Sequence, residues 1–469
     1  MSADRVNATR VDASHPGQDA NRQHIPHADD ESAAVVSGIP RLLRSPITLW
    51  VAFLLVHLVL GWLCLHANGL PLGDVTLVYR PWAQQAQTGL ALPGISEPWV
   101  YPILAIVPVM LPLLAGAANY AGAWLTMVLL LNAVAFAVLT VRSHRRGSTA
   151  GVVAAWWWLG FLILLGPIAI ARLDAVSVAL AIVALLWLGL RPQLAAVLLA
   201  VATWIKVWPA AIIASLIVAS RHRWRMLGDV VATSIVVVIL ALAFGSGMNV
   251  FSFITQQTGR GLQIEAPISV PWMWAAALKV PGSSVYYDRD ILTFQVTGAN
   301  IDIPIALMTP LLGIAVLVVL LIGIRAMHHE APPMMVLPTL SLAVVTTMIA
   351  FNKVGSPQYV TWLAAPVILG LIYRRRAFRT PAILVAVTAA MTQLIYPYLY
   401  DWVITANPIM VLVLTARNAL FFVILGWAIA ALWRSARLGD RHEPDPSPAE
   451  VWPFAPEHPL SYRIHQQKE

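Results

Sequence analysis

Asp74 is the first side chain whose type and position could support catalysis. It follows the first long apolar run and lies in the loop segment 73–82, which also contains Tyr79. A carboxylate at the edge of a low-dielectric medium can act as a general base that takes a proton from a hydroxyl nucleophile. An aspartate there could instead cap a helix, because it accepts hydrogen bonds from the free N–H groups of the first turn. Both interpretations stay open on the sequence alone.

Three basic residues could bind an anionic group. Lys206 stands between two tryptophans in the segment TWIKVWP, Arg260 begins the segment RGLQIE, and Lys353 lies in FNKVGSPQY. A lysine in an apolar helix is costly unless it snorkels or meets an anion. Fixed cations stabilise the charge that develops on a leaving phosphate. The alternatives are snorkelling for Lys206 and a solvated loop with an internal ion pair for Arg260. A capped turn is the alternative for Lys353.

Other polar residues accompany these candidates. Four of them could hydrogen-bond sugar hydroxyls: Tyr79, Gln263, Gln358 and Tyr359. Tyr79 could equally belong to an aromatic belt at a membrane interface. Arg172 and Asp174 are close enough in the chain to pair with each other. Arg417, deep in an apolar run, is expected to hold helices together or to reach a polar pocket.

The elements that position these residues must be membrane helices. Of the 469 residues, 59% are hydrophobic and 11% are charged, whereas soluble domains have about 25% charged residues. Apolar runs near the length of a bilayer crossing recur between residues 47 and 433, and nothing alternates like a barrel strand. We therefore expect an all-α polytopic membrane protein. The single cysteine, Cys64, excludes a disulfide framework and a thiolate metal site.

The apolar runs predict about 12 transmembrane segments. Their expected ranges are 47–66, 120–141, 149–169, 173–190, 193–219 as two short helices, 226–245, 303–324, 332–351, 357–373, 380–399 and 409–433.

Two apolar runs need a special interpretation. Residues 193–219 lie between Arg191 and Arg221, which belong to the same side, so one span cannot connect them. Two short helices that meet near Lys206 and break at Pro209 satisfy the charge pattern. Residues 103–116 are short and contain two prolines, so we expect a juxtamembrane helix in the outer interface.

The distribution of charge gives the orientation. Short turns rich in arginine, together with both tails, belong to the cytoplasmic side by the positive-inside rule. The net charge of +8 therefore reflects topology and contact with membrane lipids, and we expect no nucleic-acid partner. Residues 1–40 are expected to be a disordered cytoplasmic tail without a signal peptide, and 438–469 a second cytoplasmic tail. Residues 41–437 then form one transmembrane catalytic domain.

Two large outer loops, at about 67–119 and 246–301, carry most of the candidate residues. The second loop contains Asp288 and Asp290 around Arg289, a sequence similar to a metal-bound nucleotide-sugar motif. Nucleotide sugars are absent from the outer side of a membrane. We therefore expect neither a metal nor a cofactor.

Several of these pieces together resemble glycosyltransferase family 87, also described as DUF2029, which includes actinobacterial mannosyltransferases that use polyprenol-phosphate mannose. The resemblance covers roughly residues 47–433. The pieces are Asp74 with Tyr79, Tyr101-Pro102, Arg172-Leu173-Asp174, Lys206 with Pro209, RGLQIE at 260–265 and NKVGSPQY at 352–359. The last is the most specific. Ile103 departs from the family pattern, in which a second proline often follows Tyr-Pro, so the geometry of the juxtamembrane helix is left open.

The resemblance implies a GT-C-type bundle with catalysis on its outer face, a lipid-linked sugar donor, and Asp74 as the catalytic base. We expect an inverting glycosyltransferase of the plasma membrane. It would move a sugar, foremost mannose, from a polyprenyl-phosphate donor to a cell-envelope glycolipid or glycan in α-linkage. Lys206, Arg260 and Lys353 would bind the donor phosphate, and the four polar residues named above would bind sugar or acceptor.

Two alternatives remain on the sequence. The first is an arabinofuranosyltransferase that uses polyprenyl-phosphate arabinose. The second is a transporter or flippase, which predicts paired charges near mid-membrane and two halves related by a repeat. Only Arg417 lies deep in an apolar run, and no repeated halves are evident.

Overall fold

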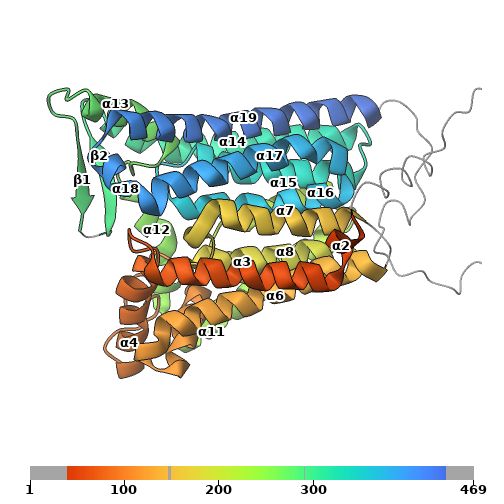
Figure 1. The fold of residues 1–469 in the computed structure, drawn as a ribbon, viewed down its shortest axis with the longest axis horizontal. Helices are drawn as coiled ribbons and strands as arrows, with labels where there is room; N and C mark the ends of the chain where they lie inside the picture. The colour runs from red at the N-terminus through yellow and green to blue at the C-terminus, as the bar shows by residue number, and fades with distance from the viewer. Residues whose placement is uncertain (1–39, 146–148, 290, 440–469) are drawn as a thin grey trace, which may run out of the picture. The chain divides into compact units, whose positions relative to one another are not determined.

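The computed structural model describes residues 40–145, 149–289 and 291–439 (Figure 1). The chain divides into two compact units, Met1–Arg44 and Ser45–Glu469. In the first unit the described part contains the short helix α2 (Arg41–Arg44). The predicted tails at 1–40 and 438–469 lie almost wholly outside the described residues.

The second unit is a bundle of helices, and each predicted membrane segment corresponds to one of them. They are α3 (Pro46–His66), α6 (Tyr120–Arg145), α7 (Thr149–Leu165), α8 (Leu173–Trp187), α9 (Pro192–Ile205), α10 (Ala210–Ala219), α11 (Arg223–Ala243), α14 (Asp302–His328), α15 (Pro333–Ala350), α16 (Ala364–Tyr373), α17 (Arg375–Gln393) and α19 (Pro408–Gly439). In the described part of the chain, 8 helices are long and apolar enough to cross a membrane, and the others are shorter. This confirms an all-α polytopic membrane protein.

Helix length separates the centre of the bundle from its outside. At 1.5 Å per residue, the 21-residue α3 is about 31 Å long, whereas the 15-residue α8 is about 22 Å and the 10-residue α10 about 15 Å. The apolar window of α14 is only 11% buried, as expected for a helix that faces lipid, and that of α15 is 78% buried. Most side chains of α8 are buried as well. The helices α8 and α15 therefore lie in the centre of the bundle, and α14 lies on its outside.

The break between α9 and α10 occurs where the sequence predicts it. The backbone leaves α9 at Lys206, which is extended at φ −150° and ψ 134°, and α10 begins directly after Pro209. Proline cannot donate an N–H group inside a helix, so the apolar run is interrupted there. The interruption places a charged residue on non-helical backbone between two helix ends.

The first large loop is built from short turns. It contains η1 (Asp74–Tyr79), α4 (Arg80–Thr88), η2 (Ile103–Ala105), α5 (Ile106–Met110), η3 (Leu111–Ala115) and η4 (Ala117–Asn119). The apolar run at 103–116 is therefore a succession of 3₁₀ and α-helical turns. Prolines at 108 and 112 explain the interruptions, because each removes a backbone donor.

The second large loop contains a β-hairpin and short helices. Its elements are η6 (Gly247–Phe251), α12 (Ser252–Thr258), η7 (Pro267–Ser269), α13 (Val270–Ala277), β1 (Ser284–Asp288) and β2 (Thr293–Thr297). The strands are antiparallel, with Tyr286 opposite Gln295. Three short elements lie outside the large loops. The turn η8 (Pro357–Leu363) precedes α16, and η9 (Leu394–Tyr398) and α18 (Tyr400–Ile404) follow α17.

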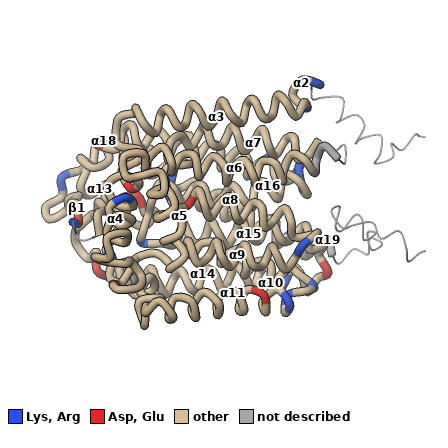
Figure 2. Tube along the Cα trace, turned by 90° about the horizontal axis from the view of Figure 1, so that it is seen from below, with Lys and Arg blue, Asp and Glu red and all other residues tan. Residues whose placement is uncertain are grey.

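Both large loops lie at the same end of the bundle. Figures 1 and 2 show α4, α13 and β1 together at one end of the long helices. The loops are joined by hydrogen bonds: the Trp99 backbone N–H donates to Ser252 Oγ at 2.7 Å, and Asn249 Nδ2 donates to the Ile95 carbonyl at 2.8 Å. The two predicted loops therefore form one continuous layer over the helix ends.

Candidate functional site

The beginning of α8 supplies two charged side chains to the helix ends beneath this layer. Arg172 precedes α8 in an extended conformation, and Asp174 lies in its first turn. They do not pair with each other as expected. Arg172 Nε lies 3.0 Å from Asp74 Oδ2, and Asp174 Oδ2 lies 3.3 Å from Lys206 Nζ. The backbone changes from extended to helical between the two residues, so their side chains serve different partners.

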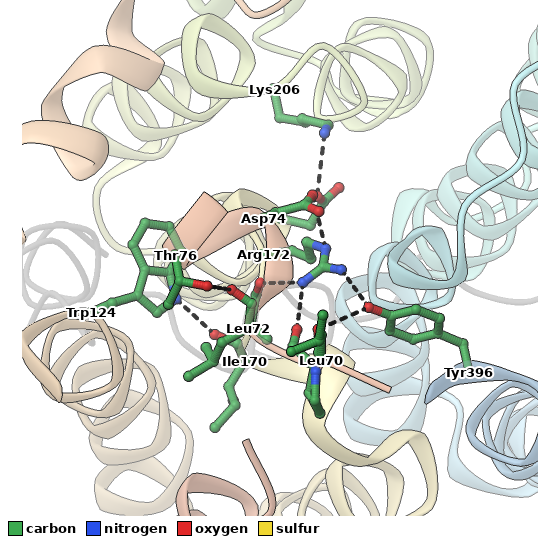
Figure 3. A network of polar contacts seen from close by, with 12 residues as sticks. Leu70, Leu72, Asp74, Thr76, Trp124, Ile170, Arg172, Lys206 and Tyr396 are labelled. Carbon is green, nitrogen blue, oxygen red and sulfur yellow. Dashed lines mark hydrogen bonds and ion pairs between the residues drawn. The ribbon is translucent and has the colours of Figure 1, made fainter. Parts of the chain in front are cut away.

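Arg172 is held in place by several acceptors. Its Nη1 donates to the carbonyls of Pro71 at 2.7 Å and Ala171 at 2.8 Å, and its Nη2 donates to the Tyr396 hydroxyl at 2.9 Å. Figure 3 shows Arg172 between Asp74 and Tyr396, with Lys206 above Asp74 in this view. Its side chain is 6% exposed and that of Asp74 is 36% exposed. A fixed cation thus holds one oxygen of an accessible carboxylate.

The capping interpretation of Asp74 is wrong. Asp74 is the first residue inside the π-helical turn η1, Gly73 precedes it, and no side-chain hydrogen bond caps this helix. The carboxylate pairs with Arg172 instead. The other interpretation, a general base, stays a prediction.

Lys206 does not snorkel to a membrane surface. Its ammonium pairs with Asp174, which is fully buried, and lies 4.5 Å from the centre of the Tyr101 ring. Such cation–π contacts are favourable when the cation is desolvated. Asp174 also accepts a hydrogen bond of 2.6 Å from Trp362 Nε1. The α9–α10 break therefore carries its lysine into a buried polar centre.

Aromatic rings surround this centre. Tyr359 stacks on Trp362 with ring centres 4.1 Å apart, and Trp208 stacks on the same indole at 5.8 Å. On the opposite wall Tyr79 meets the Tyr101 ring edge at 6.4 Å. Burial raises the pKa of Tyr79 well above its usual value, and neighbouring acidic groups add to this, so its hydroxyl stays protonated. Tyr79 and Tyr359, both predicted, come together with Asp74 and Lys206.

Arg260 approaches the same centre from the second large loop. Its charge acts on the Tyr359 hydroxyl. Its Nε is buried and has no hydrogen-bond partner. Among the residues that the structure describes, no carboxylate forms an ion pair with Arg260. The internal pair proposed for this loop is wrong, because Glu265 pairs with Arg417 at 2.9 Å.

Three other predicted residues are buried: Gln263 in this loop, and Lys353 and Gln358 in the segment 352–359. The Gln263 backbone N–H donates to the Lys353 carbonyl at 3.1 Å, and the three side chains belong to residues that are 3%, 5% and 8% exposed. Burial lowers the pKa of the Lys353 ammonium. The structure thus brings Gln263 and Lys353 together through their backbones, where the segments 262–266 and 352–356 meet.

The contacts add five residues to the predicted candidate set: Tyr101, Arg172, Asp174, Trp362 and Tyr396. The charges of Arg172 and Asp174 between two apolar runs were a usable signal, but their separation of two residues suggested a mutual pair. Nothing local marks Trp362 or Tyr396, because each reaches its partner from more than 180 positions away.

The aspartates of the hairpin have other partners. Asp288 accepts from Gln295 Nε2 at 2.8 Å and from the Ile291 N–H at 3.4 Å, and Asp290 lies outside the described residues. Within the described ranges no group of three or more His, Cys, Asp or Glu side chains gathers. In the described residues Asp288 is therefore hydrogen-bonded to β2.

One comparison with known proteins gives a match. The family model of glycosyltransferase family 87 matches residues 99–280. The matched part contains Tyr101, Arg172, Asp174, Lys206 and Arg260, whereas Asp74 and the segment 352–359 lie outside it. No curated protein matches the chain, and no solved structure matches it.

Proposed function

We propose, from the match of residues 99–280 to the model of glycosyltransferase family 87, that the site built around Asp74 and Lys206 transfers a sugar from a polyprenyl-phosphate donor. The family supports a glycosyltransferase, and the helices support a membrane protein. The donor, the sugar and the acceptor are the parts that we add. Mannose is the foremost sugar, and a cell-envelope glycolipid or glycan is the acceptor.

A single observation carries the proposal. Asp74 and Lys206 come from distant segments, yet Arg172-Leu173-Asp174 joins them, because Arg172 binds one and Asp174 binds the other. A partly exposed carboxylate and a largely buried cation are therefore held by neighbouring residues of one segment. This is the arrangement that a displacement on a phosphate-activated sugar requires, with a proton acceptor on one side and a phosphate receptor on the other.

The chemistry follows from these positions. The Oδ1 atom of Asp74 takes the proton of the acceptor hydroxyl as this hydroxyl attacks the anomeric carbon. The bond from that carbon to the phosphate oxygen breaks, and the electron pair leaves with the phosphate. The guanidinium of Arg260, whose Nε has no hydrogen-bond partner in the described residues, would bind the phosphate. The ammonium of Lys206 would bind it too, although Asp174 partly neutralises its charge. Lys353 is a third cation for this role.

Attack from the face opposite the phosphate inverts the anomeric centre. A β-linked donor then gives an α-glycoside. Phosphate is already a good leaving group, so the mechanism needs no general acid. Tyr79, Gln263, Gln358 and Tyr359 are proposed to contact the sugar or the acceptor, and Tyr359 is stacked where a sugar ring could reach it.

The orientation in the membrane is part of the proposal. The arginine-rich turns favour the cytoplasm, which leaves the two large loops and the site on the extracytoplasmic face of the plasma membrane. The polyprenyl chain would lie along the apolar outside of the bundle, where α11 and α14 expose apolar side chains. A GT-C-type architecture is consistent with this arrangement of short helices beneath large loops.

The test is transfer by the purified protein in lipid vesicles. Polyprenyl-phosphate mannose and polyprenyl-phosphate arabinose are supplied separately with a glycolipid extract of the envelope as acceptor. We expect a mannosylated product whose new linkage is α. A product formed only from the arabinose donor would move the function to arabinofuranosyl transfer, and a β-linked product would contradict the single displacement.

A further inference from the structure

Glu265 and Arg417 form a buried ion pair outside the Asp74–Lys206 centre. The Arg417 Nη2 and Glu265 Oε2 atoms are 2.9 Å apart, and each side chain is 2% exposed. The Tyr400 hydroxyl on α18 also lies near the Glu265 carboxylate. Arg417 belongs to the 32-residue helix α19, and Glu265 belongs to the second large loop. The pair therefore joins an irregular segment to the longest helix of the described chain.

The segment that Glu265 anchors is held on two further sides. On one side it pairs with β2, since the Val296 N–H donates to the Leu262 carbonyl at 3.0 Å and the Ile264 N–H donates to the Phe294 carbonyl at 3.3 Å. On the other side the Gln263 N–H donates to the Lys353 carbonyl at 3.1 Å. The segment 262–266 thus lies between the hairpin and the turn that carries Lys353.

The contact with that turn leaves no spare space. A Cβ atom added to Gly355 would overlap the backbone of Glu265 and Ala266. A displacement of Glu265 is therefore transmitted to residues 352–356 directly. The same displacement moves Arg260, which lies five residues before Glu265 on the same segment and whose charge reaches Tyr359.

We propose that Glu265 and Arg417 are positioning residues, which fix the segment 260–266 and thereby set where the cations Arg260 and Lys353 stand. Neither residue needs to touch the substrate. Arg417 lies on a long helix that packs along its length against α15, so it provides a rigid reference for a loop without regular structure. The part of this inference that concerns the donor phosphate rests on the proposed function.

A purely stabilising pair would behave differently from a positioning pair. Removal of one partner leaves a buried charge alone and destabilises a protein, whereas replacement of both partners by apolar residues is often tolerated. The double variant Glu265→Leu/Arg417→Leu separates the two roles. It relieves the charge problem and removes only the specific geometry.

The first measurement does not depend on glycosyl transfer. In a Cys64→Ala background, Lys353→Cys is labelled with a maleimide in detergent. The labelling rate is compared between the protein that keeps the Glu265–Arg417 pair and the protein that also carries Glu265→Leu/Arg417→Leu. Residue 353 is 5% exposed, so we expect slow labelling in the presence of the pair and labelling about tenfold faster without it, as local opening becomes easier. Equal labelling rates would overturn the inference, whatever the reaction of the protein.

The second measurement uses transfer from the polyprenyl-phosphate donor with Lys353 intact. We expect the double variant to raise the donor KM about tenfold or more while kcat changes less, because the phosphate cations are displaced. The control Trp274→Phe removes a different loop–α19 hydrogen bond, from Trp274 Nε1 to Thr415 Oγ1, and should leave KM within about twofold.

If the double variant fails to fold, Glu265→Asp takes its place. This variant keeps both charges and shortens the reach by one methylene, so the segment must shift to preserve the pair. We expect the same rise in donor KM and in labelling. A folded variant with unchanged donor KM and unchanged labelling would show that the pair only stabilises the fold. Faster labelling in the double variant, together with no transfer by the wild-type protein, would refute the proposed function and leave the positioning role intact.

Discussion

Lys206 and Asp174 show how a costly pair of buried charges becomes useful in a membrane protein. Asp174, in the first turn of α8, is fully buried and has two interactions that the sequence does not suggest, with the ammonium of Lys206 and with the indole N–H of Trp362. A buried carboxylate of this kind requires a cation, because an unpaired charge in a low-dielectric medium is strongly unfavourable. Lys206 therefore has a structural role, which is to neutralise Asp174, besides its proposed contact with phosphate.

The structural role of Lys206 and its proposed role in donor binding can be separated with variants of this pair. Lys206→Met alone should lower the free energy of unfolding by about 3–5 kcal/mol, because it leaves Asp174 charged and without a cation. The double variant Lys206→Met/Asp174→Asn should recover most of that stability but not the use of the donor. Stability is measured by denaturant unfolding in detergent, and donor use by the KM for the polyprenyl-phosphate sugar. Recovery of both quantities in the double variant would assign Lys206 a structural role alone.

The residue scale is also where prediction from sequence reached its limit. Five candidates could be selected because a polar side chain beside an apolar run is costly without a partner or a function: Asp74, Tyr79, Lys206, Arg260 and Tyr359. Their partners could not be selected. The Asp74–Arg172 pair joins residues 98 positions apart (172 − 74), and the Trp362–Asp174 bond spans 188 positions, so local pattern carries no trace of either.

At the scale of elements, close contact between the segments 262–266 and 352–356 explains a glycine. Gly355 has no room for a side chain because the backbone of Ala266 lies against it. The sequence indicated a turn in this stretch from its glycine, serine and proline, but the identity of the neighbouring segment came only from the fold.

Gly355→Ala should therefore destabilise the protein by about 1–3 kcal/mol, because the added methyl group forces the two segments apart. It should also reduce transfer, since the turn carries Lys353. The matched control is Gly228→Ala on α11, where nothing lies within 4 Å of the added atom. Helix propensity predicts that this control is stabilised by up to about 1 kcal/mol. Thermal unfolding of both variants in detergent gives the comparison, and equal melting temperatures would show that the turn can relax.

The helix elements themselves followed from the sequence with few differences. The α9–α10 break was predictable because arginines at both ends of one apolar run forbid a single crossing and Pro209 marks the interruption. The juxtamembrane run at 103–116 was predicted as one helix and is instead several short turns, since its prolines remove backbone donors. Hydropathy measures burial in lipid, and it does not report how regular the backbone is.

At the scale of the whole molecule, the proposed function requires a fixed orientation in the membrane. Both large loops lie at one end of the bundle, and hydrogen bonds join them. The turn between α10 and α11 is rich in arginine and belongs to the other side by the charge rule.

Single cysteines in a Cys64→Ala background test this orientation. Tyr287→Cys lies on β1 of the second loop, and His222→Cys lies in the arginine-rich turn; both positions are exposed. A membrane-impermeant maleimide is added to cells whose outer envelope is permeabilised and whose plasma membrane is intact. It should label Tyr287→Cys and not His222→Cys. Labelling of the second alone would place the site in the cytoplasm and exclude the proposed donor side.

The central claim is that the carboxylate of Asp74 removes the proton from the acceptor, and Asp74→Asn tests it most directly. This variant keeps the size of the side chain and its contact with Arg172, but it abolishes the base. The control is Asp302→Asn at the exposed start of α14. In single-turnover transfer from polyprenyl-phosphate mannose, we expect a loss of about 10²–10⁴-fold for Asp74→Asn and none for the control. Full transfer by a folded Asp74→Asn protein would contradict the claim.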